Sequence, residues 1–265
     1  MRQSYCRLVL IASLFFLFAA RPAAAEIDWK VAPYLWAADV GLDLTINNDP
    51  VLGASIPFSD IVDKLDSAFM FHAEGISSDS NIGGFVDVIS MSLSDTAITP
   101  VGPGGPILGD LIVATDLSLN LYEGGGILRF GDQGIDRTVM DILLGIRYVD
   151  VEQNLNITLP GPGGTPIDRR VKVSETDAMI GIRVLGQFSE RFGYRVRADI
   201  SDLGTDGIFN MLAGVNYGFG QTQFFSMELG YRYLTMDLSD NLNNGATSSS
   251  EISFAGPILG FVFSF

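Results

Sequence analysis

The chain has 265 residues, 47% of them hydrophobic, and 31 acidic side chains against 16 Lys and Arg give a formal charge of −15. Such a surface repels nucleic-acid phosphates, so a nucleic-acid partner is excluded. Beyond residues 8–20 no apolar run approaches the roughly 20 residues that a membrane-spanning helix needs, so a helical membrane protein is excluded too.

Residues 1–25 have the pattern of a secretory signal peptide. Two arginines precede the apolar run at 8–20, and three alanines end the segment at Ala25. A charged start, an apolar core of about 7–15 residues and an A-x-A site are typical of signals that are cleaved after export. We therefore predict a signal peptide at 1–25 and a single domain at 26–265. The only cysteine, Cys6, leaves with the signal, which excludes disulfides.

From residue 27 onward, large apolar side chains alternate with small or polar ones, and turn residues separate the alternating segments. Successive side chains of a strand point to opposite faces, so the pattern predicts strands with one apolar face. Apolar residues spread over alternate positions suit an all-β, closed antiparallel transmembrane β-barrel. We predict ten strands: 27–38 with an irregular extension at 40–46, 68–76, 82–94, 112–130, 138–153, 171–188, 193–201, 207–219, 222–238 and 250–265.

The third and fourth predicted strands alternate poorly. Asp87 shares its parity with Ile89, and Glu123 shares its parity with Leu121. A β-bulge at the glycines 124–126 would reset the register there. Eight or twelve strands therefore remain alternatives to ten.

The links between predicted strands alternate between short and long. An even strand number places both termini on the periplasmic side, with short turns there and longer loops outside the cell. Within the first long loop, 59–66 is the one segment with a helical pattern, and Ser59 is its expected cap. The long loops are acidic and could share divalent cations with lipopolysaccharide phosphates; they are predicted at 47–67, 95–111, 154–170 and 240–249.

The chain ends on alternating large residues, with Phe261, Phe263 and Phe265 on one face. This ending resembles the terminal signature of bacterial outer-membrane β-barrels, in which a final aromatic residue is the signal for the barrel-assembly machinery. Further blocks are similar to a family of small, uncharacterised proteobacterial outer-membrane barrels of the OmpA-barrel and OmpW kind: APYLW at 32–36, FSDIVDKLD at 58–66, LGIRY at 144–148, LGYRYL at 229–234 and GPILG at 256–260. The resemblance implies a barrel in the cell outer membrane, among its lipid and lipopolysaccharide, and no catalytic motif.

If the apolar parity faces lipid, the other parity lines the lumen. Basic and acidic side chains nearly balance there, and about ten strands leave an interior that side chains almost fill. Arginine pairs well with carboxylates in such a space, so we predict a lumen braced by charge pairs. Its predicted members are Lys30, Glu74, Asp141, Arg147, Asp177, Arg183, Arg195, Arg197, Asp199, Glu228 and Arg232.

The only histidine, His72, lies on the lumen parity with Glu74 two residues on. Outer-membrane lipid-modifying hydrolases pair a serine with a histidine, but no serine stands beside His72 on its own strand face. We interpret it as a structural histidine, predict no catalytic residue, and find no cluster typical of a metal or cofactor site.

Three functions are compatible with these patterns. The first is a structural barrel or a narrow, gated passage for small solutes. The second is a surface-adhesion protein acting through its acidic loops, and the third is a lipid-modifying enzyme.

Overall fold

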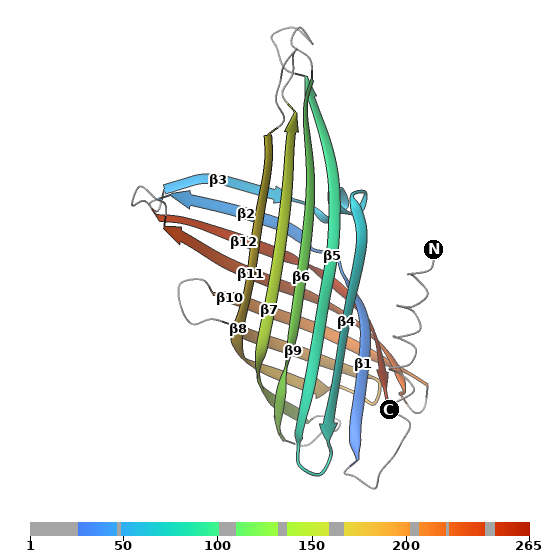
Figure 1. Ribbon diagram of the computed structural model, residues 1–265. Helices are drawn as coiled ribbons and strands as arrows, with labels where there is room; N and C mark the ends of the chain where they lie inside the picture. The colour runs from blue at the N-terminus through green and yellow to red at the C-terminus, as the bar shows by residue number, and fades with distance from the viewer. Residues whose placement is uncertain are drawn as a thin grey trace, which may run out of the picture.

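The computed structural model describes residues 26–46, 49–100, 110–131, 137–158, 167–201, 207–220, 223–241 and 247–265. The predicted signal peptide at 1–25 lies outside these residues. The described chain forms a closed antiparallel β-barrel, which confirms the predicted fold class (Figure 1).

Ten strands close the cylinder, each paired with its neighbours in the barrel. The seam joins the first and last of them, with Lys30 opposite Ser264 and Trp36 opposite Ile258. Each predicted strand is present, and the closing strands in order are β1 (Ile27–Trp36), β4 (Leu65–Ser77), β5 (Ile82–Pro100), β6 (Asp110–Phe130), β7 (Thr138–Thr158), β8 (Ile167–Gln187), β9 (Phe192–Ser201), β10 (Ile208–Phe219), β11 (Phe225–Asn241) and β12 (Thr247–Ser264).

Two further strands form a hairpin beside β12. β2 (Asp39–Ile46), the predicted extension of the first strand, pairs with β12, and β3 (Asp49–Ile56) pairs with β2. The prediction of a loop over 47–67 was therefore wrong at β3. This hairpin lies outside the ring of ten closing strands, because β3 pairs only with β2 among the described strands.

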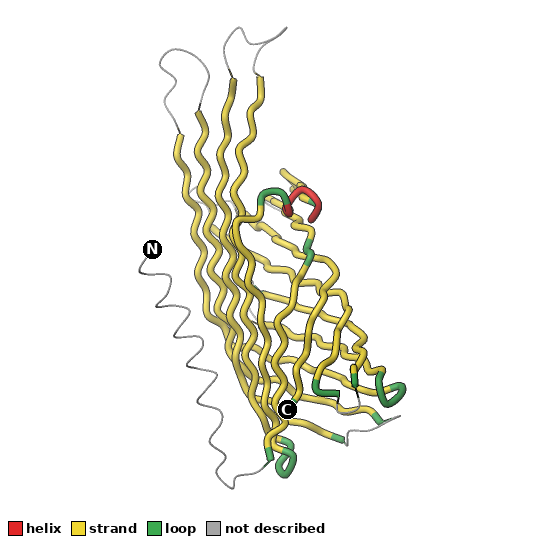
Figure 2. Tube along the Cα trace, turned by 90° about the vertical axis from the view of Figure 1, so that its right-hand side faces the viewer, coloured by secondary structure: helices red, strands yellow, loops and turns green. Residues whose placement is uncertain are grey.

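Strands β5 to β8 are also longer than predicted. Their pairing continues through Thr96 opposite Ala114 and Asn156 opposite Asp168, so the described parts of the predicted loops at 95–111 and 154–170 are strand. Figures 1 and 2 show these four strands rising well beyond the rest, while β2, β3, β11 and β12 lean to the other side. The barrel therefore divides into two projections at this end, which we call the loop end.

A short helix, α2 (Phe58–Val62), connects β3 to β4 and is the red segment of Figure 2. It is shorter than the predicted 59–66 and begins after Pro57, with no side-chain cap. The hydroxyl of Ser59 instead contacts the Asp60 carboxylate at 3.2 Å, so the predicted cap was wrong. No helix in the described part of the chain is long and apolar enough to cross a membrane.

The opposite end carries the short connections and both ends of the barrel sequence, and we call it the turn end. There the Trp29 N–H donates to the Phe265 carbonyl (2.8 Å), and the Phe265 N–H donates back to the Trp29 carbonyl (3.0 Å). The last residue is thus tied into the seam.

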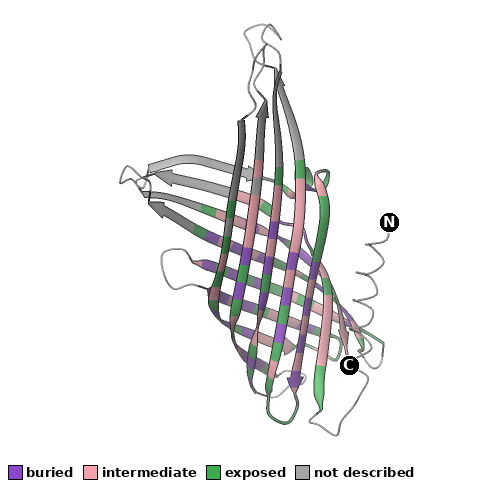
Figure 3. Ribbon diagram, viewed as in Figure 1, coloured by how far each residue is buried: buried purple, intermediate pink, exposed green. Residues whose placement is uncertain are grey.

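The outer wall is apolar. Large side chains at alternate positions are exposed, such as Ile146 (62%), Leu229 (56%) and Ile182 (54%), and Figure 3 shows exposed and buried residues alternating along the strands. Water penalises exposed apolar area by roughly 25 cal/mol per Å², and a continuous surface of this kind favours a lipid environment.

Two belts of aromatic side chains bound this apolar wall. The turn-end belt consists of Phe192, Tyr217, Phe219, Phe225, Phe261 and Phe263, and the loop-end belt of Tyr122, Tyr148, Phe209 and Tyr233. On β11 the belts are represented by Phe225 and Tyr233, and a tilted strand between them spans about 20 Å of depth. This is close to the roughly 25 Å apolar band of outer-membrane barrels.

The three glycines of β6 do not form the predicted β-bulge. The pairing of β6 with β5 and β7 runs through them without a register shift, and Gly125 lies directly opposite Gly145. A Cβ on Gly125 would lie 2.2 Å from the Leu144 carbonyl oxygen, and one on Gly145 would lie 2.4 Å from that of Gly124. Gly125 and Gly145 are required because the two backbones approach closely there.

Candidate functional site: the charged lumen

The register of the strands places opposite charges side by side inside the barrel. Across β6 and β7, Glu123 faces Arg147 and Arg129 faces Asp141; across β7 and β8, Asp141 faces Arg183. Alternate side chains point inward, so neighbouring strands in register bring these groups together. We call the inward charged side chains of these strands the charged layer. Their placement follows directly from the strand pairing.

One set of these side chains, the Asp141 group, lies toward the turn end. Arg129 donates Nε and Nη2 to the two oxygens of Asp141 (2.8 and 2.9 Å), and Arg183 donates Nε and Nη2 to Oδ2 (2.9 and 2.7 Å). Arg183 Nη1 also contacts Glu74, whose Oε1 lies 3.8 Å from Lys30 Nζ. Two guanidiniums thus share one fully buried carboxylate.

A second set, the Glu123 group, occupies the centre of the lumen. Arg147 donates Nε and Nη2 to Glu123 Oε1 (2.9 and 2.7 Å), and Arg197 donates Nη2 to Oε2 (2.6 Å). Both arginines also bind Asp199, where Arg197 Nε lies 2.6 Å from Oδ2. Arg147 and Glu123 are enclosed, so these are the strong, charge-assisted bonds of a dry site.

Neutral polar side chains complete the Glu123 group. Arg147 Nη1 donates to Ser201 Oγ (3.1 Å), and Asn210 Nδ2 donates to Asp199 Oδ2 (2.8 Å). The Asn210 carbonyl oxygen in turn accepts from Arg232 Nε (2.9 Å). Such bonds matter because a buried polar atom without a partner costs about 1–3 kcal/mol.

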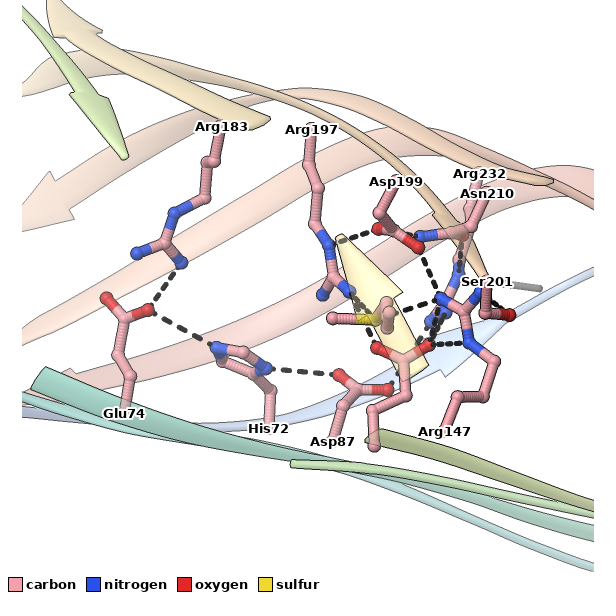
Figure 4. Close-up of polar contacts among 12 residues, drawn as sticks. His72, Glu74, Asp87, Arg147, Arg183, Arg197, Asp199, Ser201, Asn210 and Arg232 are labelled. Carbon is pink, nitrogen blue, oxygen red and sulfur yellow. Dashed lines mark hydrogen bonds and ion pairs between the residues drawn. The ribbon is translucent and has the colours of Figure 1, made fainter. Parts of the chain in front are cut away.

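His72 connects the two groups through a carboxylate on each side. Its Nδ1 lies 3.1 Å from Asp87 Oδ2 and its Nε2 lies 3.4 Å from Glu74 Oε2, as Figure 4 shows. Asp87 also accepts from the Tyr34 hydroxyl (2.9 Å), and Arg232 Nη1 donates to that hydroxyl (3.1 Å). Carboxylates only accept, so the imidazole satisfies both contacts when both ring nitrogens carry a proton.

Apolar side chains occupy the lumen on both sides of the Glu123 group. The loop-side plug is built from inward residues of eight strands and contains Trp36, Met70, Ile89, Leu119, Leu121, Val149, Ile208, Leu212, Leu234, Met236, Phe254 and Ile258. On the turn side of the Glu123 group, the turn-side cluster contains Ile76, Phe85, Ile127, Leu143 and Met179. Leu121, Leu234 and Ile127 have no exposed surface. The Glu123 group is therefore packed between two apolar layers, and Ile127 and Leu143 separate it from Arg129 and Asp141.

Arginine planes also contact aromatic rings of these layers. The Arg232 guanidinium carbon lies 5.1 Å from the Trp36 ring centroid, and that of Arg197 lies 5.5 Å from the Phe85 ring centroid. Both distances are within the range of a cation–π interaction. The apolar layers and the charged layer are thus one packed interior.

The structure brings together the predicted lumen residues with one exception. Lys30, Glu74, Asp141, Arg147, Arg183, Arg197, Asp199 and Arg232 lie in the connected groups, and Arg195 and Glu228 form a pair of their own. The exception is Asp177, which lies opposite Arg147 in the register and is only partly buried.

Three lumen residues, Asp87, Glu123 and Arg129, were not predicted from the sequence. Asp87 and Glu123 share their parity with Ile89 and Leu121, which suggested a lipid-facing row. Those apolar residues belong to the loop-side plug, so the whole row points inward. The pairing of β6 and β7 begins with Phe130 opposite Met140, and seven residues further along each strand Glu123 lies opposite Arg147. Counting residues outward from this pair could therefore have identified Glu123 as a lumen residue.

No described serine is recorded among the partners of His72, which are Glu74 and Asp87. Its interpretation as a structural histidine stays a prediction. Within the described residues, no group of three or more His, Cys, Asp or Glu side chains could hold a metal ion. The predicted cation-binding loops fall largely on 101–109, 159–166 and 242–246, which lie outside the described residues.

No known family model matches the chain, and no curated protein matches it. Similar solved structures include the outer membrane protease OmpT from Escherichia coli, with 8% identity and a TM-score of 0.42, covering 94% of this chain and 99% of that one. Another is Ail, the attachment invasion locus protein of Yersinia pestis, with 9% identity and a TM-score of 0.30, covering 88% of this chain and 99% of that one. A third is a Pseudomonas aeruginosa FadL homologue, with 9% identity and a TM-score of 0.32, covering 91% of this chain and 90% of that one. These likenesses are too distant to carry an argument about function.

Proposed function

We propose that the protein is an integral barrel of the cell outer membrane whose lumen is closed at rest. It serves as a structural barrel or as a narrow, gated passage for small solutes. The apolar wall between two aromatic belts supports the membrane location, and the turn end, with its short connections, then faces the periplasm. Export by a signal peptide cleaved after Ala25, and partnership with lipopolysaccharide and the barrel-assembly machinery, belong to the same proposal.

One observation carries the closed lumen: the Glu123 group lies between the loop-side plug and the turn-side cluster, and the Asp141 group follows on the turn side of Ile127 and Leu143. Inside the charged layer, a cavity of only about 30 Å³ lies among Tyr34, His72, Asp87 and Arg232. One buried water molecule needs roughly 10–15 Å³ of such space, so the cavity holds about two or three of them. A hydrated solute has no room to cross without a rearrangement of the plug.

Conductance in planar bilayers tests this proposal. The purified protein is expected to give no large, steady current at neutral pH and moderate salt, because ion passage requires the plug to move. A double variant, Leu121→Ala with Leu234→Ala, removes two enclosed plug residues and is expected to raise the frequency of opening. The matched control is Leu144→Ala with Leu229→Ala on the outer wall. Steady porin-like currents from the unmodified protein would contradict a closed lumen.

A second candidate function is surface interaction through the loop end. β6, β7 and β8 each have 21 residues, whereas a tilted strand crosses the bilayer in about 9–11. The β5–β8 projection therefore extends a rigid ribbon away from the membrane. We expect that a shortened variant lacking 95–115 and 154–171 still folds but loses attachment to host-cell or extracellular-matrix surfaces. Unchanged attachment of cells displaying this variant would argue against the candidate.

A further inference from the structure

The lumen contains a second cavity, open toward the turn end, with a volume of about 90 Å³. Its walls come from β1, β6, β7, β8, β9 and β10, so it lies at the mouth of the barrel rather than on the outer wall. The charged lining residues are Lys30, Arg129 and Arg137, and no carboxylate of the described chain lines it. This is unusual in a protein with a formal charge of −15.

The described carboxylates that pair with Lys30 and Arg129 are shared with another arginine. Asp141 binds Arg129 and Arg183, and Glu74 binds Arg183. Asp28, one inward position nearer the mouth than Lys30, lies 3.4 Å from the hydroxyl of Ser78, which follows β4. Among the described residues, the wall of the cavity therefore carries three cations and no carboxylate.

Lys30 and Arg129 retain donor groups for a ligand. Lys30 Nζ lies 3.8 Å from Glu74, longer than a hydrogen bond, and its side chain is 35% exposed. Asp141 engages Nε and Nη2 of Arg129, which leaves Nη1 as the guanidinium nitrogen that Asp141 does not bind. An ammonium and guanidinium forks are the groups that proteins use for phosphate-like anions.

Neutral polar groups complete the lining. The side chains of Gln187, Tyr194 and Asn216 face the same cavity, and the Tyr194 hydroxyl lies 3.0 Å from Thr138 Oγ1. Val139 and Leu185 form an apolar part of the wall. Amide and hydroxyl donors converging with three cations on a space of this size fit an anion of a few heavy atoms.

We propose that this mouth cavity is a binding site for a small oxyanion, namely phosphate or the phosphate group of a small phosphomonoester. Lys30, Arg129 and Arg137 supply the positive charge, and Gln187, Tyr194 and Asn216 supply neutral donors. The site is reached from the turn end, and it ends at the Asp141 group. It is therefore a site of binding and does not require an open lumen.

The test is isothermal titration of the folded protein in detergent with inorganic phosphate, and separately with glycerol 3-phosphate, at constant ionic strength. Both ligands are expected to bind, and phosphate is expected to raise the unfolding temperature relative to chloride. Lys30→Gln and Arg137→Gln are each expected to weaken binding about tenfold or more, the loss expected from one charge-assisted contact. Lys172→Gln, at an exposed lysine of the loop end paired with Asp150, is the matched control and leaves binding unchanged.

The titrations with phosphate and glycerol 3-phosphate can support or overturn the anion site. Binding of the phosphomonoester alone would support the site and identify an organic phosphate as its ligand. Absence of phosphate-specific heat with both ligands, or equal affinity in Arg137→Gln and the unmodified protein, would overturn the proposal. Arg137 is exposed, so its variant is informative even if Lys30→Gln fails to fold. Conductance in bilayers tests the closed lumen, and titration with phosphate tests the anion site. Failure of one proposal can therefore be distinguished from failure of the other.

Discussion

Replacement of Glu123 by glutamine is expected to lower the free energy of unfolding by about 3–5 kcal/mol, the usual cost of leaving buried partners without their counter-charge. Glu123 is 3% exposed and accepts hydrogen bonds from Arg147 and Arg197, and Arg232 Nη2 lies 3.7 Å away. Glutamine has the same shape but no charge, and it adds an NH₂ group facing guanidinium donors. Three arginines would then share too little negative charge in a dry interior.

Equilibrium urea unfolding in lipid vesicles measures this loss. The matched control is Glu251→Gln on β12, an exposed carboxylate that accepts from the Thr235 hydroxyl at 3.0 Å. Its effect is expected to stay within about 0.5 kcal/mol. The double variant Glu123→Gln with Arg147→Gln is expected to cost less than the sum of the single variants, because each removes the partner of the other. Equal stability of the Glu123 and Glu251 variants would show that the charged layer is well hydrated.

Replacement of Leu229 by arginine is expected to cost about 2–4 kcal/mol in a bilayer, the penalty for a cation at the midplane of an outer-membrane barrel. Leu229 is 56% exposed on the outer wall and lies on β11 between Phe225 and Tyr233, one from each aromatic belt. An arginine there must enter hydrocarbon or distort the membrane. The measurement is the free energy of unfolding from lipid vesicles.

The control for this prediction is an arginine placed nearer the membrane interface than Leu229. Thr176 is an exposed residue of β8 that lies opposite Tyr148 of the loop-end belt, so Thr176→Arg is placed near the interface. Its cost is expected to be about 0–1 kcal/mol. If both arginines cost the same, the apolar wall would not be a lipid-facing band, and the membrane location would have to be abandoned.

The sequence was most informative where lipid contacts one face of each strand. Lipid imposes a strict alternation, and the strands around Ile146 and Leu229 could be predicted from it. Beyond the aromatic belts that constraint ends, which is why β3 and the outer parts of β5, β7 and β8 were not predicted. The backbone pairing continues there with no alternating signal to reveal it.

The lumen was predictable only in part for a different reason. Arg147, Arg183 and Asp199 alternate with lipid-facing apolar residues, so parity identifies them. On β5 and β6 the inward row mixes Asp87 and Glu123 with Ile89 and Leu121, because the lumen holds a packed apolar plug as well as charges. Hydrophobicity alone cannot separate an inward apolar residue from an outward one.

The sequence separation of the lumen partners has a consequence for biogenesis. Tyr34 and Arg232 are 198 residues apart, Glu74 and Arg183 are 109 apart, and the seam joins the first strand to the last. Contacts of such long range cost loop-closure entropy before the contacts themselves contribute any stabilising free energy. The guanidiniums must stay hydrated until nearly the whole polypeptide has been delivered, and their dehydration then coincides with sealing of the cylinder. Maturation of the nascent chain should consequently be all-or-none, with no long-lived half-inserted species.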